Sequence, residues 1–194
     1  MYQPANRPAS MTGLVLTAGG ARGAYQAGVL KRISEIPALA NRPSPFQIVT
    51  GASAGAINGA AIAAHSASLQ DGARLLVKLW SGLEAHNVFR TDSLALAQNA
   101  GRLVLDFALG GLFGAGRTQS LVDSSPLRGF LGGHFGTLLP RIDDAIRSGH
   151  LYALAVTATG YHSGRSFTFV QGQEGHPVWN KSRRVAVPLD AMTL

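Results

Sequence analysis

The alternation of apolar and polar positions divides this 194-residue chain into short strands and helices. Four apolar runs that contain β-branched or aromatic residues predict strands at residues 13–17, 46–50, 151–157 and 166–170. Helical periodicity predicts helices at residues 24–33, 56–64 and 69–83. Because strands and helices alternate in the first half, we predict an α/β fold with a largely parallel sheet. The turn-like stretch 159–165 between the last two strands favours a hairpin at the sheet edge.

Polar segments and one broken apolar region set the limits of the predicted domain. Residues 1–10 are polar and contain two prolines, so we expect a flexible leader and a domain spanning 11–194, with a polar loop at 171–177. The longest apolar region, Leu103–Phe113, is interrupted by Asp106 and by two glycines, and it is too short to span a bilayer. It is interpreted as an ordinary buried helix, with a lid or an acyl-channel wall as the alternative.

The segment Gly51-Ala52-Ser53-Ala54-Gly55 joins the predicted strand 46–50 to the predicted helix 56–64. A sharp turn from a strand into a helix forces its central residue into a strained backbone conformation, and small neighbours let the two elements approach closely. This pattern is typical of a nucleophile elbow, which would present the hydroxyl of Ser53 at its tip. A tight glycine-lined turn without chemistry is the alternative.

A second glycine-rich segment, residues 18–23, follows the first predicted strand and precedes the helix 24–33. Successive glycines let backbone N–H groups converge, and a helix N-terminus adds partial positive charge, so the segment suits a developing oxyanion. Ala18 stands where a dinucleotide fingerprint needs its first glycine, and residues 41–43 offer no acid for a ribose. The Gly-Lys-Ser/Thr ending of a P-loop is also absent. A flexible turn would explain the glycines, whereas an oxyanion-hole loop also explains the elbow that follows.

Residues 18–23 and 51–55, in this order, resemble the paired motifs of the patatin-like phospholipases, lipid acyl hydrolases with a Ser–Asp dyad. Thr118–Arg128 is also similar to a segment common in bacterial members. The resemblance implies a three-layer α/β/α fold related to the α/β-hydrolases, with a mainly parallel central sheet that is incomplete at the C-terminus. It also implies a lipid or phospholipid substrate that is degraded at a carboxylic ester bond. Ser53 would be the nucleophile, Gly51 and Gly55 would shape its elbow, and the oxyanion hole would comprise Gly19, Gly20, Ala21 and Arg22.

The aspartate of the dyad has no evident counterpart in this sequence. Family members carry it in an Asp-Gly-Gly or Asp-Gly-Ala turn far downstream of the serine, and the sequence ends at Leu194 before such a turn. We therefore expect the aspartate to lie beyond Leu194 and these 194 residues alone to have little or no activity. Asp71-Gly72-Ala73 matches by letters, but it falls in the predicted helix 69–83, where Asp71 would serve as a cap or a dipole partner.

With such a dyad the expected reaction passes through an acyl-enzyme. A carboxylate within hydrogen-bond reach takes the proton of Ser53 as its oxygen attacks the acyl carbonyl. The loop amides then stabilise the oxyanion, and the loss of one good donor raises the barrier by about 3 kcal/mol. Water releases the fatty acid.

Two other functions stay open at this point. A Ser-His-Asp hydrolase needs a histidine base, and none of the six histidines is singled out by its neighbours: His65, His86, His134, His150, His162 and His176. A non-catalytic lipid- or partner-binding domain would keep the elbow as a structural turn. No histidine pair has the spacing of a zinc site and the chain has no cysteine, so we predict neither a metal nor another cofactor.

The formal net charge of +7 concerns the choice of partner. The basic residues are scattered, with tight groups only at 31–32 and 181–184, which argues against nucleic acid. A basic surface suits anionic lipid interfaces at about 1 kcal/mol per residue near the membrane, although an acidic segment beyond Leu194 would also explain the imbalance. Arg22 would support its loop, face an anionic head group or be solvated. The polar N-terminus and the lack of cysteine favour the cytoplasm, with peripheral contact to a membrane.

Overall fold

The computed structural model describes residues 10–84, 126–127, 129–130, 132, 137–159, 165–174 and 184–188. The chain divides into two compact units, one of residues 1–81 and 137–193 and the other of residues 82–136 and Leu194. The strands and helices described below belong to the first unit. Residues 1–9 of the predicted leader, the apolar region 103–113 and most of the segment 118–128 lie outside the described residues.

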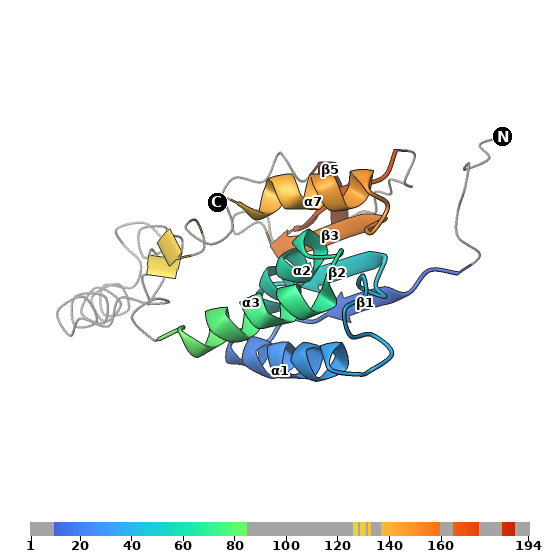
Figure 1. Ribbon diagram of the computed structural model, residues 1–194. Coiled ribbons are helices and arrows are strands. Elements are labelled where there is room, and N and C mark those ends of the chain that lie inside the picture. The colour runs from blue at the N-terminus through green and yellow to red at the C-terminus, as the bar shows by residue number, and fades with distance from the viewer. Residues whose placement is uncertain are drawn as a thin grey trace, which may run out of the picture. The chain divides into compact units, whose positions relative to one another are not determined.

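Five strands form one sheet in the order β1-β2-β3-β4-β5 (Figure 1). Their bounds are Gly13–Leu16 for β1, Ile48–Ala52 for β2, Ala153–Thr159 for β3, Ser166–Gly172 for β4 and Arg184–Pro188 for β5. β1, β2 and β3 pair in parallel, β3 and β4 pair antiparallel, and β4 and β5 pair in parallel. The predicted mainly parallel sheet is therefore confirmed, and so is the antiparallel pairing of the last two predicted strands. Their predicted place at the sheet edge is wrong, because β5 pairs with β4 on its other side. The predicted polar loop 171–177 starts too early, because β4 extends to Gly172.

Four helices accompany the sheet: α1 at Gly23–Ser34, α2 at Ala54–Ala64, α3 at Leu69–Ser81 and α7 at Leu138–Arg147. A short 3-10 turn, η1 at Gly20–Arg22, precedes α1. α2 packs on β1, β2 and β3, while α1, α3 and α7 pack around α2 (Figure 1). This mixed α/β arrangement confirms the predicted fold class. The second helical layer of a three-layer fold stays a prediction.

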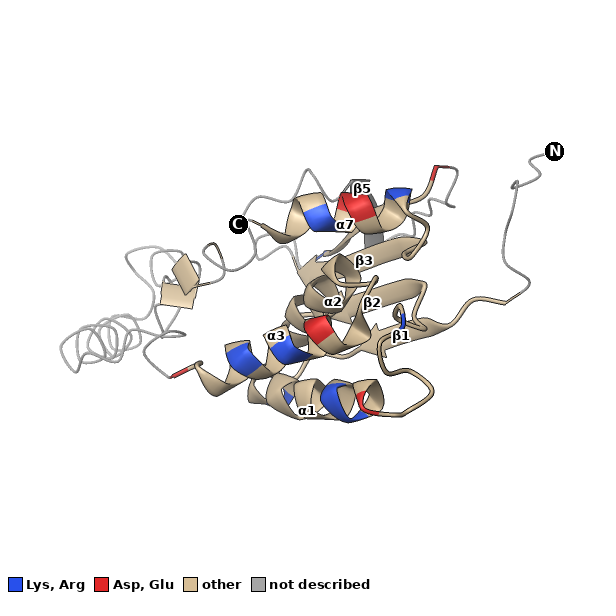
Figure 2. Cartoon of the chain, in the orientation of Figure 1, with Lys and Arg blue, Asp and Glu red and all other residues tan. Residues whose placement is uncertain are grey.

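The core lies between α2 and the three parallel strands. Val49 of β2 and Leu154 of β3 are register partners and both are 0% exposed. α2 consists of alanine, glycine and isoleucine with one asparagine, so the helix lies close to the sheet. Charged side chains instead gather on α1, α3 and α7 (Figure 2). The helix that begins directly after Ser53 is therefore the central, buried helix of the unit.

Candidate functional site

Ser53 occupies the turn between β2 and α2 in a strained backbone conformation, with φ 52° and ψ −123°. Such a conformation costs a non-glycine residue of order 1–3 kcal/mol, so the surrounding structure must enforce it. The residue is exposed, and its side chain forms no capping hydrogen bond with α2. A serine that only started a helix would cap it. Ser53 instead leaves its hydroxyl open to solvent at the carboxyl end of β2.

Two glycines make this turn possible. A Cβ atom at Gly51 would overlap the carbonyl group of Gly55, and a Cβ atom at Gly55 would overlap the carbonyl oxygen of Leu16. The first turn of α2 therefore lies directly against the end of β1. Leu16 is also the register partner of Gly51, so the ends of β1 and β2 are level. The turn at Ser53 and the start of the glycine-rich loop consequently lie together at the carboxyl ends of these parallel strands.

The glycine-rich loop leaves β1 and turns through η1 into α1. Gly20 has φ +52°, a left-handed conformation that glycine adopts without steric penalty. The N–H of Arg22 donates to the carbonyl oxygen of Gly19 at 3.0 Å, so this amide is already used within the turn. In the part of the chain that the structure describes, the amides of Gly19, Gly20 and Ala21 have no such acceptor. Among the described residues these three amides are therefore without a hydrogen-bond acceptor, whereas the amide of Arg22 closes the turn.

A buried polar network connects this loop to α2 and α3. Asn58 of α2 is 0% exposed, and its Nδ2 donates to the carbonyl oxygen of Gly23 and to Oε1 of Gln26, both at 3.0 Å. Its Oδ1 accepts a hydrogen bond from Nε1 of Trp80 at 2.7 Å. Nε2 of Gln26 in turn donates to the carbonyl oxygen of Thr17 at 2.8 Å. The network therefore holds both ends of the loop, at Thr17 and at Gly23.

Sequence reasoning missed these network residues. The available signal was Asn58, a lone polar residue in an otherwise apolar helix, because a buried amide needs hydrogen-bond partners. The sequence analysis gives no role to Ala54. Its N–H lies in the first turn of α2, where amides lack intrahelical partners, and it directly follows Ser53.

Asp71, the residue with the matching Asp-Gly-Ala letters, lies in the first turn of α3. Its amide donates to Oγ of Ser68 at 3.3 Å, and its carboxylate pairs with Arg74 at 2.8 Å. The other end of α3 carries Trp80, which reaches Asn58. Asp71 is thus a helix-start residue at the far end of α3, in agreement with the sequence analysis.

The two described histidines are engaged away from Ser53. His65 follows the last residue of α2, with Nδ1 hydrogen-bonded to the carbonyl oxygen of Ala61 at 2.9 Å and Nε2 facing Arg141 at 3.2 Å. An eleven-residue helix is about 16 Å long, so His65 is remote from Ser53. His150 contacts Oγ of Ser148 at 2.9 Å before β3 begins. The histidines at 86, 134, 162 and 176 lie outside the described residues.

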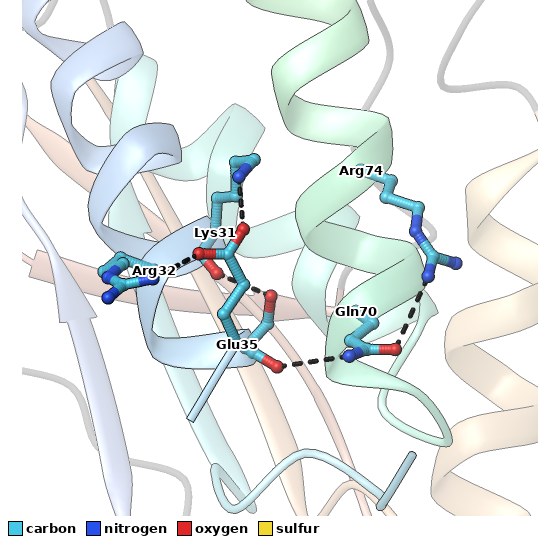
Figure 3. A network of polar contacts seen from close by, with 6 residues as sticks. Lys31, Arg32, Glu35, Gln70 and Arg74 are labelled. Carbon is cyan, nitrogen blue, oxygen red and sulfur yellow. Dashed lines mark hydrogen bonds and ion pairs between the residues drawn. The ribbon is translucent and has the colours of Figure 1, made fainter. Parts of the chain in front are cut away.

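A groove of about 450 Å³ runs between α1 and α3. Figure 3 shows the polar contacts along it, among them those of Lys31, Glu35, Gln70 and Arg74. The hydrogen bond from Lys31, and to a smaller extent that from Arg32, lowers the pKa of Glu35 below its ordinary value. Gln70 accepts a hydrogen bond from Arg74 at 3.5 Å. These side chains partner one another and Ser53 does not line the groove, so we assign it no part in the chemistry.

Comparison with known proteins adds one match. The family model of the patatin-like phospholipases matches residues 14–178, which include the glycine-rich loop, the turn at Ser53, all of β1 except Gly13, and the strands β2 to β4. No curated protein and no solved structure gave a match. No helix in the described ranges is long and apolar enough to cross a membrane.

Proposed function

Because the chain belongs to the patatin-like phospholipase family, we propose that it is a serine hydrolase that cleaves carboxylic esters of lipids through an acyl-enzyme on Ser53. The family is one of lipid acyl hydrolases in general, which supports a lipid substrate. The observation that carries the assignment of Ser53 is its backbone. Ser53 is exposed at φ 52° and does not cap its own helix, so no capping hydrogen bond offsets the cost of its backbone strain. Strain of this kind is typical of a nucleophile held ready for attack.

The proposed reaction begins with proton transfer from Ser53. As Oγ attacks the carbonyl carbon, its proton passes to an aspartate of the dyad, and the carbonyl oxygen becomes an oxyanion. The amides of Gly19, Gly20 and Ala21, together with that of Ala54, donate to this oxyanion. The intermediate then collapses, the alcohol leaves with the proton, and water releases the fatty acid from Ser53. Asp71 is paired with Arg74 in α3, so we propose that a different aspartate is the base, in the Asp-Gly-Gly or Asp-Gly-Ala turn that the family carries far downstream of the serine.

A fluorophosphonate probe tests the nucleophile directly. We expect covalent labelling at Ser53, measured by peptide mass, and its loss in Ser53→Ala. Ser81→Ala is the matched control, because Ser81 is also exposed and its Oγ donates to the carbonyl oxygen of Lys78 at 3.1 Å, within its own helix. Labelling should be slow in the 194 residues alone and faster when the coding sequence beyond Leu194 is included. A folded, extended protein that leaves Ser53 unlabelled contradicts the proposal.

We further propose that the protein acts in the cytoplasm at anionic lipid surfaces. The support for this step is the formal net charge of +7. The charged positions on α1, α3 and α7 are of both signs (Figure 2), so the net charge carries the argument. Basic residues close to an anionic membrane each contribute about 1 kcal/mol. Vesicle binding tests this step separately from the chemistry of Ser53.

A further inference from the structure

The donor and acceptor roles in the buried network at Asn58 are fixed by chemistry. An indole N–H can only donate and a backbone carbonyl can only accept. Trp80 therefore requires Oδ1 of Asn58 on its side, and the carbonyl of Gly23 requires Nδ2 on the other. The remaining Nδ2 hydrogen goes to Oε1 of Gln26, which turns Nε2 of Gln26 toward the carbonyl oxygen of Thr17. No buried polar side-chain atom in the described residues lacks a partner, so the network is complete.

The two carbonyl groups that this network reaches are the ones that flank the loop. Thr17 precedes and Gly23 follows residues 18–22, which carry the proposed oxyanion donors. Asn58 belongs to α2, the helix that starts immediately after Ser53. One buried side chain thus links the helix of the nucleophile to one end of the loop directly and to the other end through Gln26. The loop cannot shift along α2 without breaking at least one of these hydrogen bonds.

Trp80 brings α3 to the same point. A Cβ atom at Gly23 would overlap the indole ring and lie 3.0 Å from Cβ of Ala54. The ring therefore packs against the first residue of α1, beside the residue that follows Ser53. Stability alone does not require a polar network here. Replacing both partners of a buried hydrogen bond by apolar groups of the same shape often leaves the free energy of unfolding nearly unchanged. The polar chemistry here instead fixes direction and distance.

We propose that Asn58, Gln26 and Trp80 are positioning residues that set the distance between the loop amides and the oxygen of Ser53. This inference rests on the proposed function of Ser53. The expected effect is large, because a misplacement of about 1 Å in a reacting geometry can cost on the order of 100-fold in rate. These residues touch neither substrate nor reacting atoms, and they act only through the loop.

Trp80→Phe tests the proposal while keeping an aromatic side chain at this position. It removes the indole N–H that donates to Oδ1 of Asn58. The smaller ring also lacks Cζ2 and Cη2, the indole atoms that lie against Gly23. We expect fluorophosphonate labelling of Ser53 to slow by about 10-fold or more per folded molecule. With an ester substrate, measured in the extended protein used for the labelling test, we expect kcat to fall by a similar factor and KM to change less than about twofold, since an interaction made in the transition state is lost.

Ser66→Ala is the matched control. Ser66 is 1% exposed near the opposite end of α2, and its Oγ donates to the carbonyl oxygen of Ala63 at 2.7 Å. This variant also loses a buried hydrogen bond, but it does not touch the loop. It should lower the melting temperature while labelling at the wild-type rate per folded molecule. Equal slowing in Ser66→Ala and Trp80→Phe would mean that the network acts only through stability.

Amide hydrogen exchange of Arg22 gives a readout that does not depend on activity, because its N–H is held within the loop by the carbonyl oxygen of Gly19. We expect faster exchange at this amide in Trp80→Phe and no change in Ser66→Ala. If Trp80→Phe fails to fold, Gln26→Met removes the hydrogen bond to Thr17 at similar length and is expected to show the same two effects. If the wild-type protein is not labelled, the proposed function of Ser53 is wrong. The exchange data still test whether the network positions the loop. If Trp80→Phe and Gln26→Met both keep the wild-type rates of labelling and of exchange, the positioning role is wrong.

Discussion

Gly55 allows the first turn of α2 to lie on the end of β1, and no other amino acid fits there. A Cβ atom at this position would overlap the carbonyl oxygen of Leu16, which is backbone and cannot rotate away. We predict that Gly55→Ala lowers the free energy of unfolding by about 1–3 kcal/mol through overpacking. The variant should also lose fluorophosphonate labelling of Ser53, because α2 moves away from the loop. Urea unfolding and labelling measure the two effects.

Gly28→Ala is the control for this prediction. Gly28 also lies in a helix, but its Cβ would meet nothing within 4 Å. Alanine there should stabilise the protein by up to about 1 kcal/mol, because glycine is a poor helix former. Its labelling rate should stay at the wild-type value. The prediction for Gly55 is wrong if both alanine variants behave alike.

The residues of the site differ in how far the sequence reveals them. Gly51, Ser53 and Gly55 are close in sequence, and a Gly-x-Ser-x-Gly turn between a strand and a helix has a local signature. Asn58 and Trp80 lie 22 residues apart, and their hydrogen bond forms only because α3 packs back against α2. A single sequence contains no record of that packing. The partner of a buried amide therefore had to come from the structure.

Helices and strands with a local sequence pattern were predicted, and those that depend on distant packing were not. α1, α2 and α3 were predicted within about two residues of their ends, because their apolar positions recur regularly over ten or more residues. α7 was not predicted. Its buried stripe consists of only Leu138, Ile142 and Ala145, and Pro140 lies in its first turn, where proline is tolerated. β5 was missed because five residues ending in Pro188 form a strand only through their pairing with β4.

The last turn of α1 and the residue after it form a charged cluster whose acid dependence can be predicted. Lys31 and Arg32 both donate to Glu35, and these hydrogen bonds lower the pKa of its carboxyl below 4.5. A depressed folded pKa means that the ion pairs stabilise the protein above pH 4.5, and that this contribution is lost as the pH falls through the folded value. Because Glu35 is exposed, the effect on stability is small.

The order of the two causes gives a sharper test. Lys31→Met should raise the pKa of Glu35 more than Arg32→Met does, since the hydrogen bond from Lys31 is the larger cause. A carboxyl ¹³C titration by NMR measures the three values directly. Glu35→Gln should remove this part of the acid dependence of unfolding. A Glu35 that titrates at its ordinary value in the unaltered protein would show that the cluster does not form in solution.

The arrangement of the sheet explains why the site lies where it does. Parallel strands end at the same edge, so the loop after β1 and the turn after β2 meet without any special contact between distant segments. The alternation of strands and helices was enough to predict this edge. The placement of the charged helices required the structure. α1, α3 and α7 carry most of the described charge, whereas α2 carries none (Figure 2).

Binding to lipid vesicles tests whether this charge has a partner. With a formal net charge of +7, the protein should sediment with phosphatidylglycerol vesicles at low ionic strength and remain in solution with phosphatidylcholine vesicles. Salt at about 0.5 M should release it, because the screening length then falls to a few ångströms. Ser53→Ala should bind equally well, since the substitution changes no charge. Binding that is insensitive to salt, or equal on neutral vesicles, would show that apolar contacts rather than the net positive charge hold the protein to lipid.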